Sequence, residues 1–176
     1  MTLKKFKGRQ LTWLLVGLAF VCNSCGIYSF TGTSISPDIK SISIGNFENN
    51  SGEGPSALTQ RLTEDFRNYF QRNTNLLVIP SDGDLELTGQ ILGYSFSPAA
   101  IQRQEGVDIA SVNRLTITVQ VSFVNNKDPE QNFEQSFNAA EDFPQDQDPS
   151  RISDAALSRI TERIIVNVFN KSVANW

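Results

Sequence analysis

The clearest pattern in the chain is a strict alternation of polar and apolar residues between positions 114 and 123. Apolar side chains hold the odd positions, whereas arginine, threonine, glutamine and serine hold the even ones. Successive side chains of a strand point to opposite faces, so this segment predicts a strand with one buried face and one wet face. Weaker patterns predict further strands at 39–47, 76–79, 84–97 and 132–139.

The strand predicted at 84–97 changes phase part-way along. Two apolar sets follow one another on opposite faces: Leu85, Leu87 and Ile91, then Leu92, Tyr94 and Phe96. The change falls around Gly89 and Gly93, and glycine inside a strand often marks a bulge or a bend. We therefore expect a bulge here, or a strand bent over the core.

Apolar residues at spacings of three and four predict a first amphipathic helix after residue 54. Pro55 suits the first helical position, where its missing N–H costs nothing, and Asn73 or Asn75 can end the helix. Arg67 and Arg72 fall toward that end, where they complement the helix dipole. The predicted buried stripe is Leu58, Leu62, Phe66, Tyr69 and Phe70.

A second helix is predicted to begin at Asp148 and Pro149, a capping residue followed by proline. Its stripe repeats every four residues: Ile152, Ala156, Ile160, Ile164 and Val168. The predicted order is therefore β-α-β-β-β-β-α. The fold class that follows is α+β, a two-layer sandwich with both helices packed on one face of a mostly antiparallel sheet.

The first residues resemble a bacterial targeting segment. Four basic residues precede an apolar run from Leu11 to Val21, which has about half the length needed to span a bilayer. This arrangement is typical of a signal peptide. Ser24 is a small residue directly before Cys25, as lipoprotein processing requires, although Cys22 holds the place where a leucine is usual.

We therefore expect residues 1–24 to be removed, Cys25 to carry the lipid, 25–38 to be a tether and 39–176 to form one domain. The alternative is an ordinary secreted protein in which Cys22 and Cys25 form a disulfide or stay free. Gly26 is not the aspartate that often retains a lipoprotein in the inner membrane. An outer-membrane lipoprotein, anchored by palmitate and other acyl chains with its domain facing the periplasm or a barrel lumen, is the favoured interpretation.

Charge narrows the possible partners. Without residues 1–24 the chain keeps all 19 acidic residues and loses four of its 15 basic ones, which gives a net charge of −8. Nucleic acid is therefore not an expected partner, because binding phosphates needs a basic surface. The same charge opposes adsorption to anionic lipid, so the acyl chains must provide the membrane attachment.

The sequence offers little catalytic chemistry. It contains no histidine, which excludes Ser–His and Cys–His nucleophiles and histidine-based zinc sites. Two acidic groups lack the spacing of a calcium-binding EF-hand loop and are explained by turns and a helix N-terminus: Asp82, Asp84 and Glu86, and Asp142, Asp146 and Asp148. No phosphate-binding GxxxxGK motif occurs. We expect no enzyme activity, no cofactor and no metal site.

With these elements in place, the chain resembles the lipopolysaccharide-assembly lipoprotein family, LptE. The likeness begins with the segment Cys-Gly-Ile-Tyr-Ser-Phe at 25–30 and covers nearly all of 25–176. Shorter matches follow in order: Thr74-Asn75-Leu76, Gly83-Asp84-Leu85, Gly89-Gln90-Ile91, Gly93-Tyr94-Ser95 and Pro98. Membership implies a domain that partners and plugs the LptD β-barrel of the cell envelope and helps it to deliver lipopolysaccharide to the outer leaflet.

Two surfaces could serve such a role. The threonine-rich face at 116–122 could meet a polar barrel lumen, although plain exposure to solvent explains it equally well. Lipopolysaccharide is anionic, and Arg103, Arg114 and Lys127 are the basic residues expected in or beside the loops of the sheet. They are candidate lipopolysaccharide contacts, with solvated loop charges as the alternative.

Two other classes of function stay open. The strand, polar turn and helix at 42–64 are similar to parts of periplasmic lipoproteins that activate a peptidoglycan synthase or serve a secretion channel. A surface lipoprotein that binds glycans is a third possibility. Few aromatic residues lie outside predicted core positions, which counts against glycan binding, and Trp176 has no assigned role.

Overall fold

The computed structural model describes residues 35–99, 112–144, 146, 148 and 152–174. Cys25, Arg103 and Trp176 lie outside the described residues, as do the expected signal peptide and most of the expected tether. Neither α-helix in the described part of the chain is long and apolar enough to cross a membrane.

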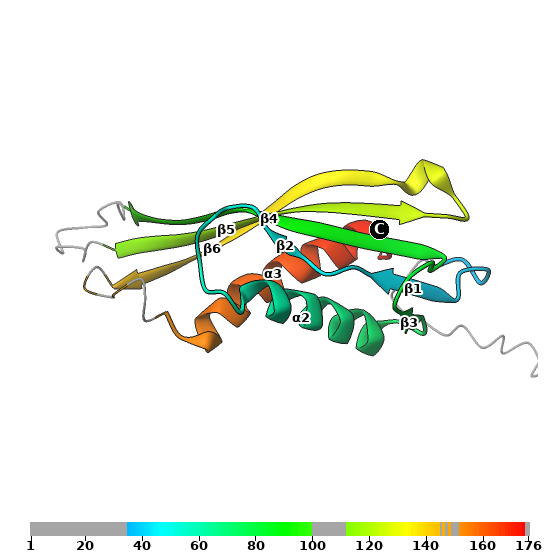
Figure 1. Ribbon diagram of the computed structural model, residues 1–176, viewed down its shortest axis with the longest axis horizontal. Helices are drawn as coiled ribbons and strands as arrows, with labels where there is room; N and C mark the ends of the chain where they lie inside the picture. Colours follow the sequence, from blue (N-terminus) through cyan, green and yellow to red (C-terminus); the bar gives the residue numbers. More distant parts are fainter. Residues whose placement is uncertain (1–34, 100–111, 145, 147, 149–151, 175–176) are drawn as a thin grey trace, which may run out of the picture. The chain divides into compact units, whose positions relative to one another are not determined.

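The described residues form one mixed sheet with two helices against one of its faces (Figure 1). The strand order is β3-β1-β4-β5-β6, with β2 beside β4. The strands are β1 (Ser41–Ile44), β2 (Glu48–Asn49), β3 (Leu77–Ile79), β4 (Leu85–Ala99), β5 (Val112–Asn125) and β6 (Phe133–Pro144). The helices are α2 (Leu58–Asn73), α3 (Asp154–Ser172) and the short 3-10 turn η1 (Pro129–Gln131).

Two kinds of strand pairing divide the sheet. The short strands β1, β2 and β3 pair in parallel, and α2 provides the crossover between the neighbours β1 and β3. The long strands β4, β5 and β6 form an antiparallel meander, which supplies most of the paired residues. The predicted α+β class and element order are confirmed, and the two-residue strand β2 is an addition to them.

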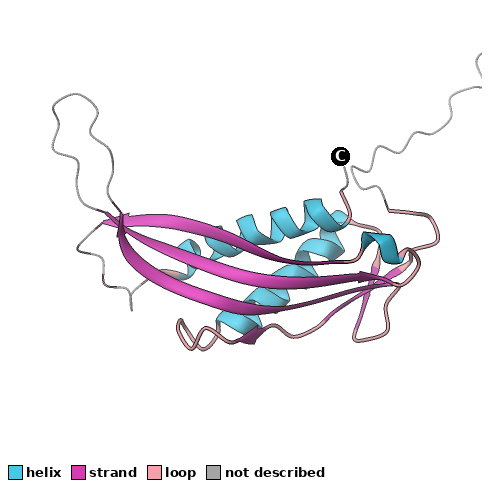
Figure 2. Cartoon of the chain, turned by 90° about the horizontal axis from the view of Figure 1, so that it is seen from above, coloured by secondary structure: helices cyan, strands magenta, loops and turns pink. Residues whose placement is uncertain are grey.

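The core lies between the meander and the helices (Figure 2). The odd positions of β5 are buried from Leu115 to Phe123, as the alternation predicts. The stripe of α2 and the part of the α3 stripe from Ala156 onward lie against them. Phe47 stacks on Phe66 with 4.7 Å between ring centroids and joins the β1–β2 connection to α2.

The bulge expected in β4 lies at Leu92, where the pairing with β5 shifts between Ile91 and Gly93. The extra residue restores the phase, so Tyr94 and Phe96 lie opposite the inward-facing Ile117 and Leu115. The prediction that Tyr94 and Phe96 occupy the other face is therefore wrong. Leu92 alone is turned out, with 42% of its surface exposed.

Both helices begin later than predicted. Pro55 is not the first residue of α2, because a turn in which Leu58 N donates to Pro55 O precedes the helix. Asp148 does not cap α3. Ser153 does so instead, with its hydroxyl accepting from Ala156 N at 3.3 Å.

Arg67 does not serve chiefly to complement the dipole of α2. Its guanidinium donates to Ile44 O at 2.8 Å and to Asn46 Oδ1 at 3.0 Å. These bonds satisfy the last carbonyl of β1, where the strand leaves its pairing, and tie α2 to the sheet. Arg72 is in the last turn of α2, as expected.

Candidate partner-binding surface

The sheet face turned away from the helices is almost entirely polar, and we call it the outer face. The register of the meander places its residues opposite one another, and most carry a hydroxyl or an amide. Its central positions are Thr88, Gln90, Gly93 and Ser95 on β4, Thr116, Thr118, Gln120 and Ser122 on β5, and Glu134, Ser136 and Asn138 on β6. The threonine-rich segment identified in the sequence thus lies at the middle of this surface.

A chain of side-chain hydrogen bonds crosses the outer face. The Asn50 amide donates to Gln90, whose Nε2 donates to Gln120 Oε1 at 2.8 Å. Gln120 Nε2 in turn donates to Glu134 Oε1 at 2.6 Å. The sequence analysis missed this ladder because it depends on the register of three strands. The only local signal is a glutamine at an outward position of two successive strands.

This surface can do one kind of chemistry well. Its amides and hydroxyls donate and accept hydrogen bonds, and they fit a polar, hydrated partner better than an apolar one. Leu92 adds one exposed apolar side chain beside it. A bilayer core is a poor match, because these groups would lose their hydrogen bonds to water there.

Arg114, one of the predicted lipopolysaccharide contacts, forms a two-point ion pair with Asp142. Its Nε and Nη2 donate to the two carboxylate oxygens at 2.6 and 2.8 Å. This hydrogen bonding lowers the pKa of Asp142 and raises the pKa of Arg114. About half of the Arg114 side chain stays exposed, so an anionic group can reach it only in competition with Asp142.

Lys127, a second predicted contact, follows β5 and pairs with Asp84 at 3.2 Å. Asp84 also accepts the backbone N–H groups of Lys40 and Ser41 at 2.9 and 3.2 Å. The Lys40 N–H, followed by Lys127, lowers the pKa of the Asp84 carboxyl to about 2. Asp84 is therefore a structural anion that ties together the starts of β1 and β4 and the end of β5.

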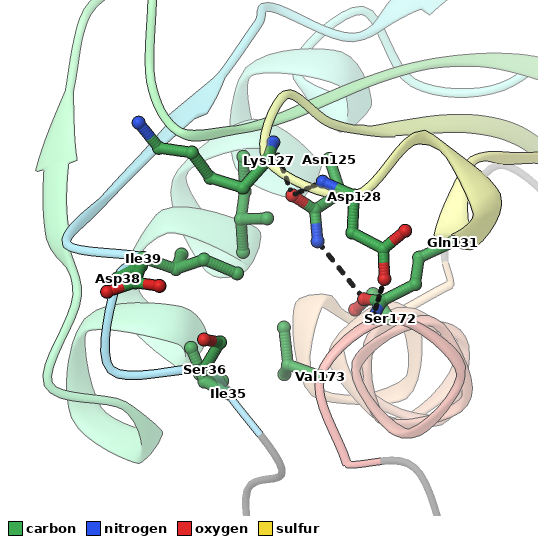
Figure 3. Close-up of a pocket in the computed structure, with 11 residues that line it drawn as sticks. Ile35, Ser36, Asp38, Ile39, Asn125, Lys127, Asp128, Gln131, Ser172 and Val173 are labelled. Carbon is green, nitrogen blue, oxygen red and sulfur yellow. Dashed lines mark hydrogen bonds between the residues drawn. The ribbon is translucent and has the colours of Figure 1, made fainter.

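Lys127 also borders a cavity of about 250 Å³ at this end of the sheet (Figure 3). The buried Asn125 amide shapes it by accepting Lys127 N and Asp128 N and donating to Gln131 Oε1. Asp38 and Asp128 also line the cavity, so carboxylates outnumber the single ammonium. The balance of charge there is unfavourable for a phosphate.

The structure does not bring the predicted basic residues together. Arg114 lies near the start of β5 and Lys127 lies beyond its end, which separates them by roughly 40 Å at the usual rise per residue. Arg103 lies outside the described residues. Arg114 and Lys127 cannot hold one small headgroup between them.

A basic pair that the sequence analysis did not single out lies where α3 meets β6. Arg159 and Arg163 share the carboxylate of Glu141, and Arg163 Nη1 also donates to Ala140 O at 2.7 Å. Both arginine side chains are just over half exposed. Their four-residue spacing was visible in the sequence, but their position beside the edge of the sheet was not. No group of three or more metal-binding side chains occurs among the described residues.

The fold and its surfaces define a two-layer α+β domain with a hydrogen-bonding sheet face. The family model described as "LptE: Lipopolysaccharide-assembly" matches residues 39–172. The chain therefore belongs to the LptE family of lipopolysaccharide-assembly proteins, as the resemblance in its sequence implied.

Solved structures share the fold at low sequence identity. The hypothetical protein CT253 of Chlamydia trachomatis is 10% identical, with a TM-score of 0.52 over 77% of this chain and 99% of its own. Lipoprotein GNA1162 of Neisseria meningitidis is 11% identical, with a TM-score of 0.42 over 74% and 99%. Rare lipoprotein B of Shewanella oneidensis is 14% identical, with a TM-score of 0.36 over 73% and 89%. No curated protein matches the chain by sequence.

Proposed function

We propose that this protein is a non-enzymatic outer-membrane lipoprotein that partners and plugs an LptD-like β-barrel during lipopolysaccharide assembly. Membership of the LptE family supports a role in that process. The observation that carries the plug role is the outer face, an extended polar surface with few charges. The lumen of a large outer-membrane barrel is polar, so a plug must offer it hydrogen-bonding side chains.

The test is a mild-detergent pull-down of the tagged, lipidated full-length protein from its native outer membrane. We expect a large barrel in near-equal amount, identified by mass spectrometry. Thr118→Arg, which places a long charged side chain in the middle of the outer face, reduces the recovered barrel several-fold. Asn68→Arg, at an exposed position of α2, is the matched control and leaves recovery unchanged.

Three outcomes decide the proposal. Recovery of a peptidoglycan synthase or a secretion channel instead of the barrel overturns it in favour of the alternative class. Recovery of the barrel with equal loss for both arginine variants shows that the outer face is not the contact. Loss for Thr118→Arg alone supports the plug role.

Membrane attachment is proposed to depend on Cys25. Cleavage before this residue would leave 25–38 as a tether and 39–176 as the domain, and the lipid would hold an acidic domain at the membrane. Cys25→Ala is expected to abolish labelling by radioactive palmitate and to release the protein from the membrane fraction. Retention of label in this variant would point to Cys22.

Direct contact with lipopolysaccharide is proposed at Arg103, Arg114 and Lys127, as separate contacts along one long ligand. Replacing all three with alanine is expected to weaken binding of purified lipopolysaccharide by about tenfold or more, since exposed charge contacts contribute modestly and together. Unchanged affinity of the triple variant removes this part of the proposal and leaves the barrel role intact.

A further inference from the structure

The meander ends in an open strand edge. β6 pairs with β5 on one side, and none of the described strands lies on its other side. Arg163 bonds Ala140 O, so the backbone groups of Ala140 point away from β5. Pairing with β5 is unbroken along β6, and strand groups alternate in direction. The N–H and C=O groups of Glu134, Ser136 and Asn138 therefore also point outward.

This edge lacks the usual protection. Natural proteins blunt an exposed edge with proline, lysine, a bulge or a cover, because unpaired backbone groups attract other strands. The six residues 135–140 contain no proline, no charged residue and no bulge. By contrast, the open part of β4 has the bulge at Leu92 and Pro98 near its end.

The flank of α3 extends the edge into a groove. A shallow cleft runs along this helix beside β6, lined by Arg159, Glu162, Arg163, Val166 and Asn167. Val166 offers a half-buried apolar surface. The two arginines share one carboxylate, Glu141, and so leave one positive charge without a partner of opposite sign among them. A strand added to β6 would lie over this cleft and alternate its side chains between it and the outer face.

We propose that the edge of β6 binds an extended segment of the barrel partner as the next strand of the sheet. Main-chain hydrogen bonds to residues 134–138 hold the segment, an apolar side chain rests on Val166, and an acidic side chain meets Arg159 and Arg163. The identity of the partner rests on the proposed function. The edge and its groove define the conformation and the charge of the segment that fits.

The test compares variants of the full-length lipidated protein in the same pull-down. Ser136→Pro and Asn138→Pro each remove an outward N–H without removing a bond to β5. Together they are expected to lower barrel recovery about tenfold, the effect of two lost hydrogen bonds. Ser136→Thr with Asn138→Thr keeps both N–H groups and is the matched control. A photoreactive residue at position 136 should cross-link to one continuous segment of the barrel, which mass spectrometry identifies.

The outcomes separate this inference from the proposed function. Barrel recovery with the wild-type chain and equally with the proline variant overturns the strand addition and leaves the plug role standing. Absence of the barrel from the wild-type pull-down overturns both. A cross-link from position 136 to a second copy of this chain assigns the edge to self-association and overturns the proposal. A proline variant whose melting temperature matches the control, but which loses the barrel, supports it.

Discussion

Gln90 on β4 donates a 2.8 Å hydrogen bond to Gln120, the residue directly opposite on β5. Gln120 passes the chain of bonds on to Glu134 on β6. These bonds are exposed or half-buried, so each is worth much less than its gross energy. Their main consequence is to fix the positions of polar groups across three strands, which presents a partner with an ordered array of donors and acceptors.

A double-mutant cycle measures this ladder. Gln90→Ala and Gln120→Ala are expected to show a coupling of about 0.5–1 kcal/mol in the free energy of unfolding, measured by urea denaturation, because the two side chains bond each other. A second cycle pairs Gln120→Ala with Ser97→Ala, which lies well away along the outer face, and should give no coupling. Equal values in the two cycles would contradict the ladder.

Gly89 is required because Phe47 lies directly over it. A Cβ at Gly89 would be 2.3 Å from Phe47 Cε1, and Phe47 is itself stacked on Phe66. Gly89→Ala is therefore expected to lower the free energy of unfolding by about 1–3 kcal/mol. Gly93→Ala on the same strand is the control, since its Cβ would meet Thr118 at an ordinary 3.5 Å. Similar denaturation midpoints for the two variants would show that the ring over Gly89 can move.

The helix cap distinguishes the observed start of α3 from the predicted one. Ser153→Ala should destabilise the protein by about 1 kcal/mol, because the Ala156 N–H loses its side-chain acceptor. Ser153→Asp retains an acceptor and should stay close to the wild type. Thermal unfolding followed by circular dichroism tests both variants, and equal melting temperatures for all three proteins would deny Ser153 the role of cap.

Asp84 makes stability depend on acid. Its folded-state pKa of about 2 lies below the unfolded value of about 3.9, so ionised Asp84 stabilises the fold above about pH 4. That contribution is lost as the pH falls toward 2. Asp84→Asn is expected to melt at a lower temperature than the wild type at pH 7, and the difference should shrink between about pH 4 and 2. A constant difference over this range would contradict the assignment.

Local patterns determined much of the architecture. The alternation along β5 and the helical stripe at Ile160, Ile164 and Val168 predicted which faces are buried, because a side chain's direction follows from the backbone period alone. The α+β class, the element order and the polarity of the outer face follow from these periods. The family resemblance likewise depended on short segments read in order.

Relations between distant segments required the tertiary structure. The bulge at Leu92 was visible as a change of phase, but only pairing with β5 decided that Tyr94 and Phe96 return to the core. The sequence contains two plausible caps for α3, and packing of the helix against β6 chose Ser153 over Asp148.

The same distinction holds for the candidate sites. Arg114 and Lys127 are identifiable as basic residues from the sequence, but their partners Asp142 and Asp84 lie 28 and 43 positions away. The strand register decides which charges are neutralised and which edge stays open. A sequence determines the period of each element through local backbone geometry, whereas register, pairing and edges depend on contacts between elements that local geometry does not encode.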